Sequence, residues 1–289
     1  MDIPATSQSF EDAVIGMFQE EWLRQRGTGA PKCIAIVDDG LEIGHPDLLG
    51  NVVPGGSIDY ADGDTALEGY FAWDNAAPSP RPGVLIVHAW AGRSTFEEEV
   101  ARKLAGLGYA GLAMDVYGKG VLGNDPEENT KLMTPFLEDR PMLQNRLQIG
   151  LQVLRDEAEV DADKIAATGY CFGGLCVLDL ARTGENFQGA ASFHGLFNKP
   201  GNTDGNSIKA KVLALHGWDD PMVPPTDVVA LAEELTSGGA DWQVHGYGNT
   251  LHAFTNPEAN APEMGAMYQA DADARSWQAM ENFLAEVLA

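Results

Sequence analysis

The feature that most constrains the fold of this chain is a regular alternation of short apolar runs with amphipathic segments from about residue 57 onward. Short apolar runs predict buried strands, and apolar positions that recur every three or four residues predict helices. The expected strands are Leu67–Trp73, Val84–His88, Tyr109–Met114, Lys164–Thr168, Ala190–Phe193, Val212–His216 and Trp242–Tyr247. The expected helices are Thr95–Leu107, Pro126–Leu137, Pro141–Ala158, Gly173–Arg182, Thr226–Ser237 and Glu263–Leu288. We therefore expect an α/β fold with a mostly parallel sheet that helices cover on both faces.

One strand end carries a motif with chemical meaning. The segment Gly169-Tyr-Cys171-Phe172-Gly173 follows an expected strand and precedes an expected helix, which makes it a nucleophile elbow with Cys where Ser is commoner. Glycines suit the flanking positions because the turn is sharp and side chains there would meet crossing backbone. The helix N-terminus favours a thiolate, and the backbone N–H of Phe172 points to where an oxyanion forms. The alternative interpretation is a buried structural cysteine.

A thiol nucleophile requires a base, and the base requires an orienting group. In α/β-hydrolases these follow along the chain in the order nucleophile, acid, histidine. The loop after the strand Val212–His216 carries Asp219 and Asp220, and the loop after Trp242–Tyr247 carries His252. The histidines His88, His194 and His216 also end strands, but His252 is the loop histidine that follows the acid.

Several motifs together resemble one family. They are Asp-Gly-Asp-Thr-Ala-Leu-Glu-Gly-Tyr (62–70), the strand Val84–His88, Asp115-Val-Tyr-Gly118, Gly-Tyr-Cys-Phe-Gly-Gly (169–174), Asp-Pro-Met-Val-Pro (220–224) and His252-Ala-Phe254. Over residues 57–289 the chain is similar to the dienelactone hydrolase family of the α/β-hydrolase superfamily. The resemblance implies a carboxylic ester or lactone hydrolase that acts on small esters through a thioester acyl-enzyme intermediate. It also implies a catalytic triad of Cys171, His252 and Asp220, with the backbone N–H groups of Phe172 and Trp90 as the oxyanion hole, and no cofactor or metal.

Two positions depart from the family pattern and affect the expected substrate. Ala89 stands where founding members carry a Glu that controls thiol ionisation, and Asn256 stands where they use an Arg to hold a substrate carboxylate. A neutral amide does not replace a bidentate guanidinium, so hydrolysis of dienelactone itself is in doubt. We take Arg93 and Tyr117 as candidate substrate-binding residues. The cations considered as substitutes for the missing Arg are Arg93, Lys119, Arg140 and Arg146, for which surface ion pairs are the alternative interpretation.

The first 56 residues have a different character. They predict a helix over Ser9–Arg26 and a short strand over Cys33–Val37. The segment Ile36–Leu48 resembles the aspartate motif of subtilisin-like, convertase-type proteases, in which Asp38 would orient a histidine. No matching His-Gly-Thr or Gly-Thr-Ser-Met segment follows, so we expect residues 1–56 to be a fused extension without protease activity. Its amphipathic helix requires burial, against the hydrolase domain or in self-association with a second copy.

Charge and cysteine content exclude several classes of protein. The chain has 18 basic and 43 acidic residues, a net charge of −25, and no cluster of Lys and Arg that would bind nucleic acid or an anionic membrane. Its 3 cysteines do not suggest a disulfide framework, and its start has no signal-peptide pattern, so we expect a cytoplasmic protein. The rival hypotheses are a Ser-type or metal-assisted hydrolase and a non-catalytic relative that binds a ligand or partner.

Overall fold

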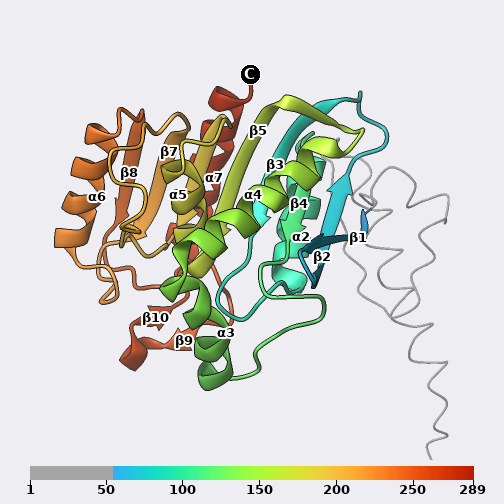
Figure 1. Ribbon diagram of the computed structural model, residues 1–289. Helices are drawn as coiled ribbons and strands as arrows, with labels where there is room; N and C mark the ends of the chain where they lie inside the picture. Colours follow the sequence, from blue (N-terminus) through green and yellow to red (C-terminus); the bar gives the residue numbers. More distant parts are fainter. Residues whose placement is uncertain (1–54) are drawn as a thin grey trace, which may run out of the picture. The chain divides into compact units, whose positions relative to one another are not determined.

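A mixed sheet of eight strands forms the centre of residues 55–289, which are the part of the chain that the computed structural model describes (Figure 1). The strand order is β1-β2-β4-β3-β5-β6-β7-β8. Strand β2 pairs antiparallel with β1 and with β4, whereas the neighbours from β4 to β8 are parallel. The bounds are β1 Gly55–Asp62, β2 Thr65–Trp73, β3 Arg81–Val87, β4 Ala110–Met114, β5 Val160–Tyr170, β6 Gly189–Phe193, β7 Lys211–Gly217 and β8 Trp242–Tyr247.

Helices cover both faces of this sheet, as expected (Figure 1). They are α2 Thr95–Gly106, α3 Pro126–Glu138, α4 Arg140–Asp156, α5 Phe172–Arg182, α6 Pro225–Ser237 and α7 Ala270–Val287. The two faces have separate apolar cores, because successive side chains of a strand point to opposite sides. Leu85 of β3 packs in the core under α3 to α6, and its neighbour Val84 packs in the core under α2 and α7.

The structure departs from the sequence-based expectation at two places. The polar, Gly-rich stretch before residue 64 contains the additional strand β1, which forms a two-residue hairpin with β2 through Gly63 at φ 57°. The helix expected over Glu263–Leu288 begins only at Ala270. Ahead of it lie a 3-10 turn, Pro262–Met264, and a small hairpin of β9 (Asn260–Ala261) and β10 (Ala266–Met267). Gly265, at φ 78°, ends the turn and prevents a continuous helix. The expected helix Ser9–Arg26, the strand Cys33–Val37 and the motif around Asp38 lie outside the described residues.

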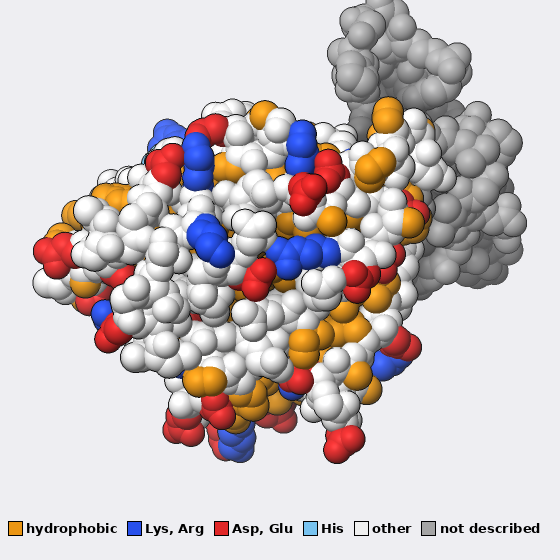
Figure 2. All heavy atoms as spheres, turned by 45° about the horizontal axis from the view of Figure 1, so that its top comes forward, with side chains coloured by type: hydrophobic (Ala, Val, Ile, Leu, Met, Phe, Trp, Pro, Cys, Tyr) orange, Lys and Arg blue, Asp and Glu red, His pale blue; other side chains and the backbone are white. Residues whose placement is uncertain are grey.

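Several exposed basic side chains lie close to acidic partners. On the face that Figure 2 shows, acidic and basic side chains are interspersed with apolar and neutral ones rather than gathered in a continuous basic patch. Lys119 lies 2.7 Å from Asp59, and Lys211 lies 2.5 Å from Glu286. None of the helices within residues 55–289 combines the length and hydropathy that a membrane span requires.

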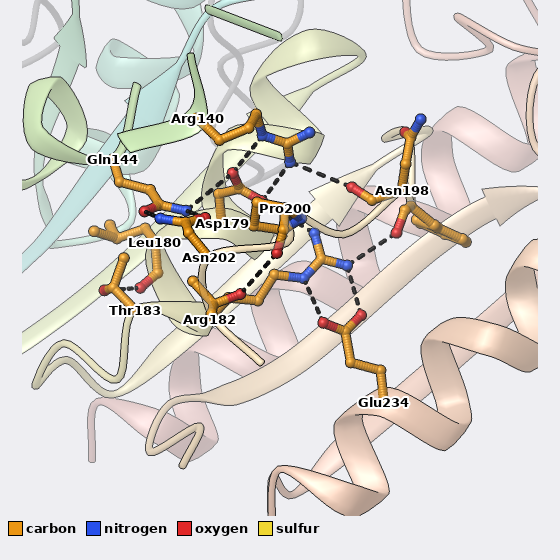
Figure 3. Close-up of polar contacts among 12 residues, drawn as sticks. Arg140, Gln144, Asp179, Leu180, Arg182, Thr183, Asn198, Pro200, Asn202 and Glu234 are labelled. Carbon is orange, nitrogen blue, oxygen red and sulfur yellow. Dashed lines mark hydrogen bonds and ion pairs between the residues drawn. The ribbon is translucent and has the colours of Figure 1, made fainter. Parts of the chain in front are cut away.

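A buried ion-pair network anchors α5, the helix that follows the elbow (Figure 3). Asp179 of α5 has no exposed surface and accepts hydrogen bonds from Arg140 of α4 and Arg182 of α5. Arg182 is 1% exposed and also binds Glu234 of α6 at 2.8 Å and the carbonyl oxygen of Phe197. Because Asp179 and Arg182 are buried, removing Asp179 leaves Arg140 without its carboxylate partner and Arg182 with Glu234 alone.

Replacing Asp179 with Ala is expected to destabilise the fold by about 3–5 kcal/mol, because it removes the buried carboxylate that the guanidinium groups of Arg140 and Arg182 share. Urea denaturation followed by circular dichroism measures the change. A matched control is Glu127→Ala, which breaks an exposed pair with Lys131 and is expected to leave the unfolding midpoint almost unchanged. Equal effects of the two substitutions would contradict the account of the network.

Candidate active site

The elbow residue Cys171 lies where β5 ends and α5 begins. Its backbone has φ 55° and ψ −114°, a strained conformation for a residue with a side chain. A Cβ on Gly169 would lie 2.2 Å from the carbonyl oxygen of Gly173, and a Cβ on Gly173 would lie 2.1 Å from that of Val87. The two glycines therefore allow the N-terminus of α5 to press against the ends of β5 and β3, as the motif predicts.

Side chains from three strand ends meet beside this turn. Nδ1 of His252 lies 2.7 Å from Oδ2 of Asp220, and both side chains are almost completely buried. The other carboxylate oxygen of Asp220 accepts a hydrogen bond of 2.8 Å from the amide of Met222, which holds the carboxylate in place. Nε2 of His252 is buried and makes no hydrogen bond of normal geometry within residues 55–289. It is nevertheless close enough to the Cys171 thiol for each group to shift the pKa of the other. The neighbouring Asp219 is exposed and takes no part in these contacts.

The charges of Cys171, His252 and Asp220 shift the pKa values of the thiol and the imidazole in the directions that favour their ionised forms. Burial acts to lower the pKa of His252, but the negative charge of the Cys171 thiolate and the hydrogen bond to Asp220 outweigh it and raise the pKa to about 10. Burial acts to raise the pKa of the Cys171 thiol, but the nearby positive charge of His252 lowers it overall. The resting site therefore favours a thiolate beside an imidazolium, the activated form of a cysteine nucleophile.

Two backbone N–H groups act on the same sulfur. The amides of Phe172 and Trp90 lie close enough to the Cys171 thiol for both to contribute to its lowered pKa. Phe172 is the first residue of α5, and Trp90 belongs to the loop after β3. The structure thus brings together the five residues that the sequence placed in the triad and the oxyanion hole. An oxyanion formed on a carbon bound to this sulfur would lie within reach of both donors.

The loop that carries Trp90 is held on several sides. Nδ1 of His88 donates to the carbonyl oxygen of Ala89 at 2.6 Å, and this carbonyl belongs to the same peptide group as the Trp90 N–H. The hydroxyl of Tyr117 donates to the carbonyl oxygen of Trp90 at 3.0 Å, and the buried carboxylate of Glu97 accepts from the amide of Ala89 at 3.3 Å. Tyr117, a candidate substrate-binding residue from the sequence, therefore uses its hydroxyl to hold this loop.

The four cations considered as partners for a substrate carboxylate are all engaged in ion pairs. Arg93, the other candidate substrate-binding residue, binds Glu68 at 3.0 Å and Glu98 at 2.6 Å. The remaining pairs are Lys119 with Asp59 and Glu68, Arg140 with Asp179, and Arg146 with Asp62. The side-chain oxygen of Asn256 accepts a hydrogen bond from the amide of Glu258 at 3.0 Å, so it closes a local turn. All four cations form ion pairs, as the alternative interpretation predicted, but the pairs of Arg140 and Arg146 are largely buried rather than at the surface.

The small hairpin before α7 braces the histidine, which the sequence did not predict. The amide of His252 donates to the carbonyl oxygen of Gly265 at 2.9 Å, and its own carbonyl oxygen accepts from the amide of Met267 at 3.0 Å. Gly265 also packs against Pro221, the residue after Asp220, so closely that a Cβ would lie 2.2 Å from the proline ring. One element thereby fixes the loops that carry both members of the His252–Asp220 pair.

The other strand-end histidines differ from His252 in their environment. His88, His194 and His216 are buried, and none of them hydrogen-bonds to a carboxylate within the described residues. Burial lowers the pKa of all three, which keeps them neutral, whereas the pKa of His252 is raised. Within residues 55–289 no group of three or more His, Cys, Asp or Glu side chains is arranged to hold a metal ion.

Comparison with known proteins gives a consistent picture. Residues 67–288 match the model of the dienelactone hydrolase family. A crystal structure of a dienelactone hydrolase-like promiscuous phosphotriesterase from metagenomic libraries is 37% identical, with a TM-score of 0.78, over 82% of this chain and 100% of that one. An uncharacterized protein of Caenorhabditis elegans is 36% identical over 51% of this chain and 95% of its own length. A putative carboxymethylenebutenolidase of Salmonella typhimurium is 25% identical over 76% of this chain and 83% of its own length.

Asp220→Asn is expected to raise the pKa of the Cys171 thiol, because it removes the carboxylate that helps to keep His252 positively charged. A depressed thiol pKa holds the thiolate as the pH falls below its ordinary range, so the loss is largest in mildly acidic buffer. At about pH 6 the rate of alkylation of Cys171 by iodoacetamide should fall roughly tenfold for each unit by which the pKa rises. The matched control is Asp219→Asn, at the exposed neighbouring carboxylate, and an equal effect of both substitutions would contradict the assignment.

Proposed function

The chain belongs to the dienelactone hydrolase family and is a carboxylic ester hydrolase, and from that premise we propose that Cys171 is the nucleophile that hydrolyses small esters and lactones. The observation that carries the proposal is the interaction of the Cys171 thiol with His252, whose other ring nitrogen binds Asp220. A nucleophile, a base and an orienting acid in this arrangement make up the machinery of acyl transfer.

The proposed reaction has two halves. The thiolate of Cys171 attacks the ester carbonyl carbon, and the amides of Phe172 and Trp90 stabilise the negative oxygen that develops. When the tetrahedral intermediate collapses, the leaving alkoxide takes the proton from Nε2 of His252, and a thioester remains on Cys171. Neutral His252 then removes a proton from water, which attacks the thioester. Expulsion of the thiolate releases the carboxylic acid and restores the ion pair, while Asp220 holds the imidazole throughout.

The substrate that fits this site is a neutral ester or lactone. The family's carboxylate-binding Arg is replaced by Asn256, which is engaged in its own turn, and the four cations considered as substitutes are paired. Four exposed apolar side chains of the described chain lie on the two segments next to the catalytic pair, two in the Asp220 loop and two in the hairpin that contacts His252. These are Trp218 and Met222 beside Asp220, and Met264 and Met267 in the hairpin that braces His252. These apolar side chains, together with the pairing of the four cations considered, favour uncharged acyl and alcohol groups.

A second candidate activity is the hydrolysis of neutral phosphotriesters. The similar structure from metagenomic libraries is described as a promiscuous phosphotriesterase, and it is 37% identical to this chain. A phosphotriester carries no net charge, and attack by a thiolate places negative charge on an oxygen, as attack on an ester does. The uncharged surroundings that argue against a carboxylate-bearing substrate are therefore compatible with such a triester.

The division of the chain is part of the proposal. Residues 57–289 are assigned to the hydrolase domain and residues 1–56 to an N-terminal extension without protease activity, except that β1 begins at Gly55, so Gly55 and Gly56 belong to the hydrolase sheet. The family match from residue 67 to residue 288 supports the extent of the hydrolase domain. The rival hypothesis, a non-catalytic binding protein, does not account for a buried histidine with a raised pKa beside a thiol with a lowered one.

Cys171→Ala is expected to abolish turnover of small neutral aryl esters, because a methyl group offers no nucleophile. The matched control is Cys176→Ala, which removes the buried cysteine of α5 and is expected to keep kcat for every substrate within a few-fold of the unaltered protein. A spectrophotometric panel of neutral aryl esters, neutral lactones, a neutral phosphotriester and dienelactone measures both variants. Full activity of Cys171→Ala on the neutral esters would refute the proposal, and a clear preference for the carboxylate-bearing lactone would refute the substrate class.

A further inference from the structure

Backbone strain concentrates around the nucleophile. Cys171 at φ 55°, His194 at φ 37° and Ala253 at φ 56° all have a left-handed backbone, although none of them is glycine. Cys171 is the elbow residue, His194 directly follows β6, and Ala253 follows the catalytic histidine. Strained residues persist only where surrounding contacts hold them, and they cluster where geometry matters for function.

The side chain of His194 connects the other two segments. Its Nδ1 accepts a hydrogen bond of 3.1 Å from the backbone N–H of Cys171, which also reaches the carbonyl oxygen of Phe193 at 3.0 Å. Its Nε2 lies 2.8 Å from the hydroxyl oxygen of Thr255, three residues after His252. The imidazole is 2% exposed and the threonine 5%, so both ends of this link are protected from water.

The ring of His194 also packs against the loop of the catalytic histidine. Its centroid lies 5.1 Å from the ring of His252, at an interplanar angle of 65°, and 5.1 Å from the ring of Phe254. Together with the hydrogen bond to Thr255, these contacts reach three of the four residues from 252 to 255. One side chain therefore touches both the backbone of the nucleophile and the segment that carries its base.

The hydrogen bonds define the protonation state of His194. Because the Cys171 N–H is a donor, Nδ1 must carry no proton, so the ring proton lies on Nε2 and is donated to Thr255. A second proton would turn Nδ1 into a donor facing a donor and would place a positive ring beside positively charged His252. Burial, together with the charge of His252, lowers the pKa of His194 well below its ordinary value, which agrees with a neutral ring.

We propose that His194 is a positioning residue, a permanently neutral histidine that joins the nucleophile elbow to the His252 loop and thereby sets the geometry between Cys171 and His252. This inference rests on the proposed chemistry of Cys171 and His252. His194 does not touch the reacting atoms. It acts by holding the thiolate and the imidazolium at the separation at which each stabilises the other.

The first test of this hydrogen-bond link changes Thr255, the partner of His194 in the His252 loop. Thr255→Val removes the hydroxyl and keeps the shape, whereas Thr255→Ser keeps the hydroxyl and serves as the matched control. The measurements are the pH dependence of Cys171 alkylation by iodoacetamide, resolved by peptide mass spectrometry, and kcat and KM for a neutral aryl ester. Thr255→Val is expected to move the alkylation inflection upward by about one pH unit and to lower kcat roughly tenfold with little change in KM. Thr255→Ser is expected to match the unaltered protein.

A second variant tests the hydrogen-bond link by changing His194 itself. His194→Asn tolerates the left-handed backbone and offers its side-chain oxygen to the Cys171 N–H, but it does not reach Thr255. His194→Asn is expected to shift the alkylation inflection upward, as Thr255→Val does. If near-ultraviolet circular dichroism shows that Thr255→Val is unfolded, His194→Asn alone tests the proposal. The proposal is overturned if a folded variant without the link keeps the inflection of the unaltered protein, or if valine and serine at position 255 shift it equally.

The alkylation readout separates this inference from the proposed function. Iodoacetamide reports on the Cys171 thiol whether or not the protein hydrolyses an ester. If the unaltered protein turns over no ester in the panel while Thr255→Val still shifts the inflection, the proposed function fails and the positioning role stands. If ester turnover is confirmed and the inflection does not move, the positioning role fails and the proposed function stands.

Discussion

The close approach of backbone to backbone at the elbow is the constraint on which the rest of the site depends. The N-terminus of α5 lies so near the ends of β5 and β3 that neither Gly169 nor Gly173 has room for a Cβ. This contact gives Cys171 its left-handed backbone and keeps the Phe172 amide, which helps to lower the pKa of the thiol, beside it at the start of α5. The buried ion pairs of Asp179 hold the same helix from its other end, so the elbow is fixed from both sides.

Charge is arranged around the elbow so that one pair of groups is ionised and the nearby rings are not. His252 has a carboxylate on one side and a thiol on the other, and both raise its pKa. His88 and His194 are buried and neutral. His88 hydrogen-bonds to the backbone of Ala89 and Val116, and His194 to the backbone N–H of Cys171 and the hydroxyl of Thr255. The neutral histidines therefore shape the site, while the ionised pair of Cys171 and His252 is suited to its chemistry.

The sequence predicted the features that depend on local pattern and chain order. The positions of Cys171, of Asp219 or Asp220, and of His252 after three strands predicted that they lie together, because parallel strands end at one edge of a sheet. The family resemblance, not the chain order, selected Asp220 over Asp219. The link through His194 was not predictable, since it requires knowing that Cys171 and Thr255 face each other across the fold. The sequence did not predict the hairpin before α7, because the apolar residues from Glu263 to Leu288 recur at helical spacing. Gly265 ends the 3-10 turn and packs against Pro221, a contact that is not visible in the sequence.

The most direct test of the central claim is to find the acyl group on Cys171. The protein is mixed with a neutral aryl ester, quenched in acid within the first turnover, digested and examined by peptide mass spectrometry. The account predicts that the peptide containing Cys171 gains the mass of the acyl group, that hydroxylamine at neutral pH removes it, and that carboxamidomethylation of Cys171 beforehand stops turnover. An acyl group on another side chain, or turnover that continues with Cys171 blocked, would contradict it.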